Sequence, residues 1–196
     1  YIGEARAIRA LCYFDMVRLW ENIPLLDIPT TDNISQANPD DVYQLIISDL
    51  KYAAENIPAN AYPKAQAASN DGHITKYAAE ALLARVYLFY SGYYGKEPAG
   101  LTRAEALAGV EDVIASGEFG LIDEFKNLWP AASVTWTTNN DGSHTKTNTY
   151  AGRGNVETVL AQKFNYTSDY NGNADGNAWQ VMICLLYTSP SPRDRG

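Results

Sequence analysis

The sequence predicts a mostly α-helical fold, in which a scaffold of helical repeats is followed by a loop-rich portion with little β structure. Segments with helical spacing of apolar residues begin near residues 39, 76 and 103, and a regular spacing of about 30 to 40 residues is typical of stacked helical repeats. Thr, Asn and Gly become frequent from residue 129 onward, which indicates loops. We therefore expect one partial domain over residues 1–183, with helices in residues 1–128 and loops in residues 129–183.

The first predicted helix, residues 3–20, is apolar on two sides. One apolar stripe contains Ala5, Ile8, Cys12, Met16 and Leu19, and the other contains Ala7, Ala10, Phe14 and Val17. A helix of this kind is expected to lie between two neighbouring helices. Cys12 is then expected to be a small buried side chain, and Arg6, Arg9 and Arg18 are expected to meet carboxylates or carbonyls where the helices touch.

The next three helices have recognisable first residues. Asn38 is placed to cap a helix that starts at Pro39, because proline is favoured at the first helical position. Thr75 is a second predicted N-cap. Thr102 and Glu105 have the spacing of a capping box, so a fourth helix is expected to begin just after Thr102.

The loop-rich portion contains one predicted strand, near residues 157–166, where apolar and polar residues alternate. Residues 135–155 have loop composition, as do residues 168–179. Within the latter, Asn171, Asn173 and Asp175 have the spacing of the first half of a calcium loop. The glutamate that should close such a loop is replaced by Met182, and a flexible Asn/Gly loop is the interpretation we prefer.

Both ends of the chain are expected to be unnatural. The sequence starts with Tyr1 rather than Met, and the eleven residues from Cys184 to Asp194 reverse-translate into a transposase adaptor used for sequencing libraries. We therefore interpret residues 184–196 as a non-native read-through tail and exclude them from fold reasoning. Only Cys12 then remains, so no disulfide is expected within the natural part.

Charge and motif spacing exclude several function classes. The formal net charge of −8 argues against a nucleic-acid partner, which requires clustered Lys and Arg. No apolar run approaches the roughly 20 residues that span a bilayer. His73 and His144 lie far apart in polar segments, without a second ligand at metal spacing, and no nucleophile or phosphate-loop motif is present. We predict no catalytic residues, no metal and no cofactor.

Aromatic residues in polar surroundings are the best candidates for ligand contact. Six of them lie in segments read as polar loops: Tyr93, Tyr94, Trp136, Tyr150, Tyr170 and Trp179. An exposed aromatic face flanked by Asn, Asp and Thr suits a sugar ring, which stacks through its C–H groups while its hydroxyls meet polar side chains. We select Trp136, Tyr170 and Trp179 as candidate sugar-binding residues. The alternative is that these rings anchor loops to the helices.

The run EARAIRALCYFDMVRLWENIPLL, residues 4–26, resembles a motif of the SusD/RagB-type outer-membrane nutrient-binding proteins, E-A-[KR]-x-[IL]-R-A-x-x-Y-F-x-[ML]-V-R-x-[FWY]-G-x-[IV]-P-L. The usual glycine of this motif is replaced by Glu21 or Asn22. Four later segments are also similar, in the same order: DDVYQLIISDLKYAAENIP, ITKYAAEALLARVYLFY, AGVEDVIASGEFGLID and GNVETVLAQKFN. The resemblance covers nearly all of residues 2–166.

This resemblance implies tetratricopeptide-like helix pairs that support a loop-rich region. It also implies a lipoprotein on the outer face of the outer membrane, whose acylated cysteine would lie upstream of residue 1. Proteins of this family deliver glycans, or peptides in some branches, to a SusC-type TonB-dependent transporter. We therefore expect a non-enzymatic glycan-binding protein. The alternatives are a peptide-binding member of the family and a tetratricopeptide-type interaction adaptor.

Overall fold

The computed structural model describes residues 1–26, 28–61, 73–129, 132–152, 155–161, 167–168 and 174–175. The chain divides into two compact units, residues 1–161 and residues 162–196. In the second unit the described part consists of two short strands, β5 (Thr167–Ser168) and β6 (Ala174–Asp175), which pair antiparallel. Residues 184–196, which we interpret as a read-through tail, lie outside the described residues.

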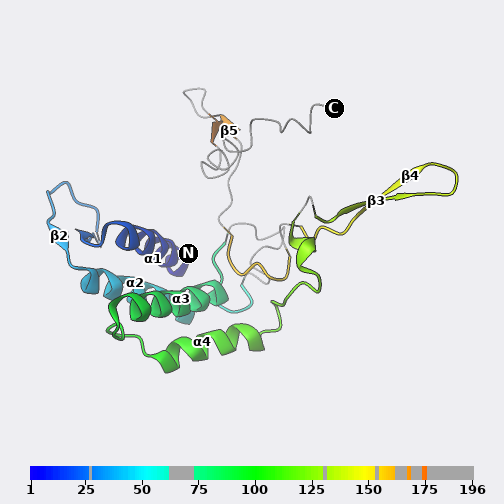
Figure 1. Cartoon of the computed structure of the whole chain (residues 1–196). Coiled ribbons are helices and arrows are strands. Elements are labelled where there is room, and N and C mark those ends of the chain that lie inside the picture. The colour runs from blue at the N-terminus through cyan, green and yellow to red at the C-terminus, as the bar shows by residue number, and fades with distance from the viewer. Residues whose placement is uncertain are drawn as a thin grey trace. The chain divides into compact units, whose positions relative to one another are not determined.

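The first unit is mostly helical, as predicted (Figure 1). Its described elements are α1 (Ile2–Trp20), β1 (Ile23–Pro24), β2 (Gln36–Ala37), α2 (Pro39–Asn56), α3 (Lys76–Tyr94), α4 (Arg103–Ala115), the 3-10 helix η2 (Phe125–Leu128), β3 (Val134–Thr138) and β4 (His144–Asn148). β1 pairs with β2 and β3 pairs with β4, both antiparallel. No helix of the described residues is long and apolar enough to cross a membrane.

The predicted helix starts are confirmed by the capping contacts. The side chains of Asn38, Thr75 and Thr102 each accept a hydrogen bond from the backbone N–H three residues further on. Thr102 and Glu105 form a complete capping box. α3 ends at Gly95, whose φ of 67° lies in the left-handed region that glycine adopts without strain. The starts of α2, α3 and α4 are therefore set by local side-chain chemistry.

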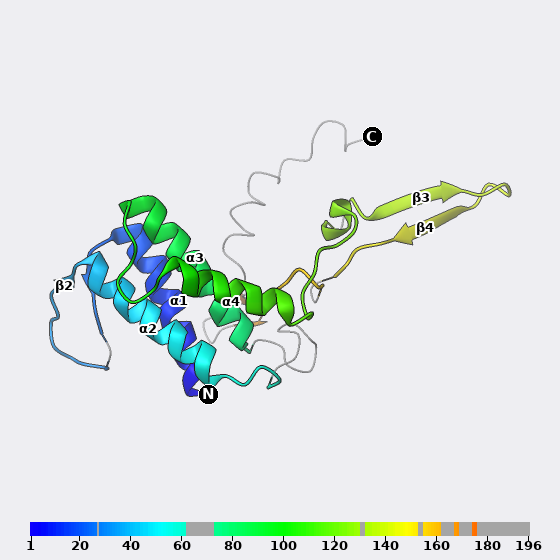
Figure 2. The same ribbon diagram turned by 90° about the horizontal axis from the view of Figure 1, so that it is seen from below.

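Successive helices pack against one another and run antiparallel. Arg9 of α1 contacts Asp49 of α2, whereas Phe14, later in α1, packs edge-on against Tyr43, earlier in α2, with ring centroids 6.3 Å apart. α2 packs in turn on α3, and α3 on α4. Figure 2 shows the same four helices side by side from a second direction. This arrangement is the helical-repeat stack that the sequence predicts.

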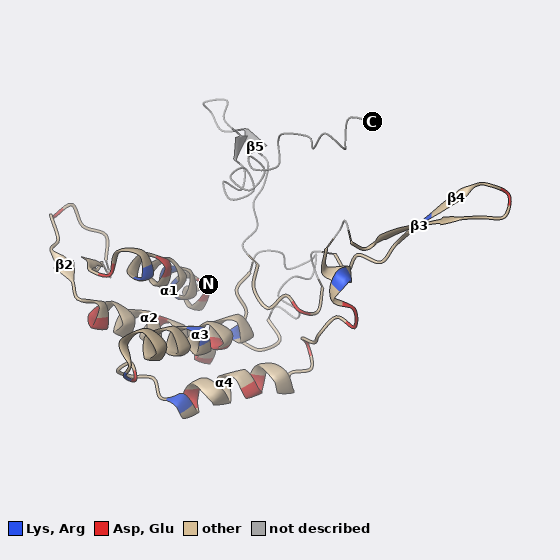
Figure 3. Cartoon of the chain, viewed as in Figure 1, with Lys and Arg blue, Asp and Glu red and all other residues tan. Residues whose placement is uncertain are grey.

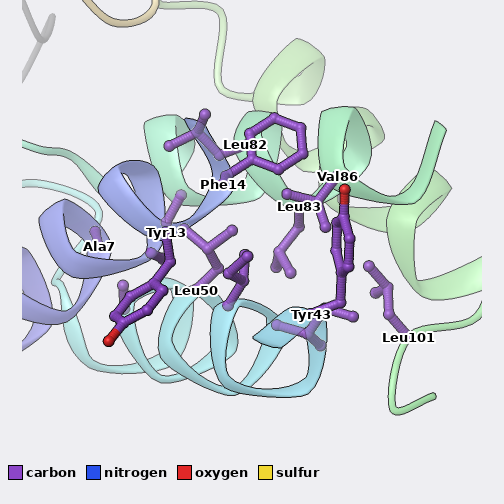
Figure 4. Close-up of a cluster of buried hydrophobic side chains, with 14 of the residues drawn as sticks. Ala7, Tyr13, Phe14, Tyr43, Leu50, Leu82, Leu83, Val86 and Leu101 are labelled. Carbon is purple, nitrogen blue, oxygen red and sulfur yellow. The ribbon is translucent and has the colours of Figure 1, made fainter. Parts of the chain in front are cut away.

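The hydrophobic core lies where α1, α2 and α3 meet (Figure 4). Tyr43 and Phe14 are the largest fully buried side chains. They join an aromatic cluster that continues through Tyr90, whose ring centroid lies 4.8 Å from that of Tyr43. Leu101, in the connection that leads to α4, closes the same core. Burial of these apolar groups is the main stabilising contribution to the stack.

Two of the three arginines predicted to lie between helices pair across α1 and α2. Asp49 is buried on α2, and Arg9 donates to both of its carboxylate oxygens at 2.7 and 2.8 Å. Arg6 Nη1 lies 3.8 Å from the same carboxylate. Arg18 bonds instead within its own helix, to Asp15 and to the carbonyl of residue 14. Figure 3 marks the positions of basic and acidic residues along these helices.

Only one of the two apolar stripes of α1 is covered by the described residues. Ala7, Ala10, Phe14 and Val17 are buried against α2 and the core. On the other stripe, Ile8 is 52% exposed and Leu19 is 71% exposed. The prediction that Cys12 is buried is wrong, because Cys12 belongs to this second stripe and is exposed.

The strand assignments require two corrections. The segment over residues 135–155, which composition predicts to be loop, contains the hairpin β3–β4. Its β-branched threonines favour extended backbone even though they are polar. The strand predicted near residues 157–166 is absent from its described part, residues 157–161, where turns and bends form instead. Residues 162–166 lie outside the described residues.

Candidate functional site

The β3–β4 hairpin carries Trp136, the predicted ligand-contacting residue that the structure describes. Residues 139–143 connect the two strands, and Gly142 adopts a φ of 80°, which a side chain would disfavour. The Asn139 N–H donates to the carbonyl of Ser143 at 2.8 Å. Asp141 accepts from both the N–H and the hydroxyl of Ser143. These bonds lower the pKa of Asp141, so its carboxylate stays ionised at the tip.

The base of the hairpin is fixed to the segment around η2. Ser133 is buried, and its hydroxyl donates to the carbonyls of Lys126 and Trp129 at 3.0 and 2.7 Å. On the other side, Thr149 donates its hydroxyl to Asn127 Oδ1 at 2.5 Å. The two ends of the hairpin are therefore held together by polar contacts, although every side chain from Thr135 to Thr138 and from His144 to Asn148 is exposed.

Trp136 lies on one face of the hairpin together with polar groups. In the antiparallel register it pairs with Lys146, whose Nζ lies 5.8 Å from the centroid of the indole ring. The next pair on this face is Thr138 and His144, whose Oγ1 and Nδ1 are 3.2 Å apart. Trp136 itself is 66% exposed. An open aromatic face beside hydroxyl, imidazole and ammonium groups can stack on a ligand ring and hydrogen-bond its polar substituents.

The opposite face of the hairpin bears hydroxyl groups and no ring. Its cross-strand pairs are Thr135 with Thr147 and Thr137 with Thr145. Because residues along a strand alternate between faces, Thr135 and Thr137 share a strand with Trp136 but not a surface. They provide matched positions for control substitutions.

The described part of the chain offers no cluster of metal ligands. It contains no group of three or more His, Cys, Asp and Glu side chains that could hold a metal ion. His73 Nδ1 lies 2.7 Å from Glu4 Oε2 and so joins residues 1–26 to the start of α3. The segment weighed as a calcium loop, residues 171–182, lies outside the described residues except for the backbone of residues 174 and 175.

A groove between α2, α3 and α4 is bridged by an ion pair. It is lined by Glu80 of α3 and by residues of the two flanking helices. Lys51 spans it, donating to Glu105 at 2.6 Å. This bond, with the capping box, lowers the pKa of Glu105 to about 2. The groove is therefore a seam between helices.

The structure also shows which aromatic residues sequence reasoning placed wrongly or missed. Tyr170 and Trp179 lie outside the described residues, so both stay predictions. Tyr93 and Tyr94 belong to the last turn of α3 rather than to a loop. Trp129, beside η2, is exposed, and sequence reasoning did not select it. Its position close to a helix end and next to Pro130 gave no signal of exposure.

The stack of antiparallel helices is a tetratricopeptide-like scaffold, and comparisons with known proteins show what its first part resembles. Residues 1–88 match the family model of SusD-like proteins, described as starch-binding and associating with the outer membrane. Residues 1–88 therefore resemble the SusD-like family.

Relatives and solved structures agree with this resemblance. A SusD-like protein of Bacteroides ovatus is 33% identical over 140 residues, which are 65% of this chain and 23% of that protein. A structure solved with a xylogluco-oligosaccharide is similar with a TM-score of 0.58 at 26% identity, covering 87% of this chain and 30% of that one. A laminarin-binding SusD-like protein gives a TM-score of 0.53 at 26% identity, covering 72% and 31%. The chain thus spans about a quarter to a third of the length of these proteins.

Proposed function

We propose that this chain is part of a non-enzymatic, cell-surface glycan-binding protein that uses Trp136 to stack on a sugar ring. The observation that carries the proposal is the exposure of this indole on a face that also presents Thr138, His144 and Lys146. A buried or paired tryptophan would indicate a packing role, but the only ring contact of Trp136 in the described residues is with the Lys146 ammonium.

The family resemblance supports the wider role. The family model describes association with the outer membrane, and two similar structures are of proteins with a xylogluco-oligosaccharide or with laminarin binding. In the proposed role the protein is lipid-anchored to the outer face of the outer membrane and passes glycan to a SusC-type TonB-dependent transporter. The helical stack serves as scaffold, and the exposed aromatic surface makes the ligand contacts.

Affinity electrophoresis of the 196-residue chain in gels containing soluble starch, laminarin or xyloglucan tests the proposal. We expect retardation by at least one of these glycans. Trp136→Ala should weaken the binding by about two- to tenfold, since loss of an aromatic stacking contact is worth roughly 0.5–1.5 kcal/mol. Thr137→Ala, on the opposite face of the same strand, should leave it unchanged. Equal retardation of the wild type and Trp136→Ala would contradict the role of the indole. Binding of peptides but of no glycan would favour the peptide-binding branch of the family.

A further inference from the structure

A second exposed aromatic surface lies where the ends of α1 and α3 meet. The hydroxyl of Tyr93, in the last turn of α3, donates to Glu21 Oε1 at 2.8 Å. Glu21 follows directly after α1, and its neighbour Trp20 is the last residue of that helix. Tyr93 is 61% exposed and Trp20 is 64% exposed. Two rings and one carboxylate therefore reach solvent, and Tyr93 is 72 positions from Glu21 in the sequence.

The backbone at Glu21 is strained. Its φ of 56° and ψ of −78° lie in a region that side chains rarely adopt, and Glu21 is the only non-glycine residue with positive φ in the described part of the chain. The SusD-type motif quoted above has glycine at this point, which would adopt the conformation without strain. A glutamate at this position therefore carries a conformational cost. Such outliers cluster at ligand-binding sites.

The ring of Tyr93 is held rigidly before any ligand arrives. It stacks on Phe89, one turn earlier in α3, with centroids 5.8 Å apart and an interplanar angle of 13°. The guanidinium of Arg18 lies 5.7 Å from the centroid of the Phe89 ring. The bond to Glu21 then fixes the phenol, and it raises the pKa of Tyr93 so that the hydroxyl remains a donor. A ring fixed at both ends loses little conformational entropy on binding.

We propose that Tyr93, Glu21 and Trp20 form a second contact site for glycan, separate from the Trp136 hairpin and selective for neutral sugar residues. The proposal rests on the glycan-binding function proposed above. A sugar ring stacks its C–H face on Tyr93 or Trp20, and its hydroxyls donate to the carboxylate of Glu21. The fixed negative charge of Glu21 repels uronate and sulfate groups, which is why the site favours neutral sugars.

The substitution Glu21→Gly separates a binding role from a structural one. Glycine relieves the strain at φ 56°, so the variant should melt at the same temperature as the wild type or higher. It removes the carboxylate, so affinity for the neutral glycan that the wild-type chain binds should fall about tenfold, the loss expected for a charge-assisted hydrogen bond. Tyr93→Ala should weaken binding to a similar extent. Leu88→Ala, an exposed position on the same helix, is the matched control and should change neither quantity.

Isothermal titration calorimetry with soluble starch, laminarin and xyloglucan measures the glycan affinity. Thermal melts measure the melting temperature. Weaker binding by Glu21→Gly at an unchanged or raised melting temperature supports the site. Unchanged affinity in Glu21→Gly and Tyr93→Ala, with Trp136→Ala still impaired, overturns this inference and leaves the proposed function standing. Absence of glycan binding by the wild-type chain overturns both. A lower melting temperature of Glu21→Gly with unchanged affinity also overturns the inference, because the Tyr93–Glu21 hydrogen bond then only stabilises the packing of α1 on α3.

Discussion

At the scale of single residues, Glu80 shows how a buried charge makes this fold sensitive to pH. Glu80 lies on α3 against Gly109 of α4, where an added Cβ would be 3.4 Å from the Cβ of Glu80. Burial raises the pKa of Glu80 to about 7. The ammonium of Lys76, 3.3 Å away, opposes this shift, and the nearby Asp112 carboxylate adds to it. Two carboxylates thus share one ammonium at the α3–α4 seam.

We predict that stability falls as pH rises through neutrality because of this residue. The pKa of Glu80 in the fold is about 7, above its ordinary 4.5, so the folded state binds the proton more tightly. The stabilisation is complete below pH 4.5 and is lost as pH rises through 7, an effect of up to about 3 kcal/mol. Glu80→Gln, which stays neutral, should be more resistant to urea than the wild type at pH 8 and similar at pH 5. Parallel pH profiles for the two proteins would refute the assignment.

At the scale of elements, helix starts follow from short-range chemistry, and α4 offers the clearest test. The backbone N–H and the hydroxyl of Thr102 both donate to Glu105 Oε2, at 2.8 and 2.9 Å. Thr102→Ala should lower the free energy of unfolding by about 1 kcal/mol, the usual contribution of an N-cap side chain. Thr102→Ser keeps the hydroxyl and should therefore keep most of the free energy of unfolding that Thr102→Ala loses. Urea unfolding followed by circular dichroism measures both, and equal losses in the two variants would mean that the hydroxyl is not what matters.

The helices were predictable from sequence because each of their signals lies within a few residues of its effect. The helix starts were predicted from three N-cap residues, and each makes the expected capping hydrogen bond in the structure: Asn38, Thr75 and Thr102. The hairpin was missed because its outward-facing threonines lack apolar alternation, although Asp141-Gly142 between two Thr-rich runs is a turn signal. The alternation near residue 159 predicted a strand that the described part does not form, since a strand also needs a partner.

The candidate site was predictable only in part, for a related reason. Trp136 could be selected from its polar neighbours in the sequence, because a segment so poor in apolar residues has little with which to bury a ring. Tyr93 could be selected as well, but its partner Glu21 is 72 positions away, and only the packing of α1 against the rest of the stack brings the two together. The positive φ of Glu21 could not be predicted from the sequence either, because there Glu21 is only one residue that differs from a motif.

At the scale of the whole molecule, α1 carries an apolar stripe that the described residues leave uncovered. The two stripes of this helix have similar hydrophobicity, so the sequence could not tell which one meets α2. Ile8 and Leu19 remain in water, one or two turns from the exposed thiol of Cys12. Large exposed apolar patches mark sites of association, so this stripe, rather than the polar hairpin, is where the chain is expected to contact other apolar surface.

We therefore predict that the isolated chain self-associates through α1. Sedimentation velocity between low and high protein concentration should show a rising weight-average mass for the wild type. The double substitution Ile8→Lys/Leu19→Lys should abolish that rise without lowering the melting temperature, because both side chains are already exposed. Val17→Lys, on the buried stripe of the same helix, is the contrasting control and should unfold the protein, since an unpaired ammonium cannot be solvated in the core. If the double-lysine variant associates as the wild type does, the contact lies on another surface, and the exposed side of α1 is not the associating face.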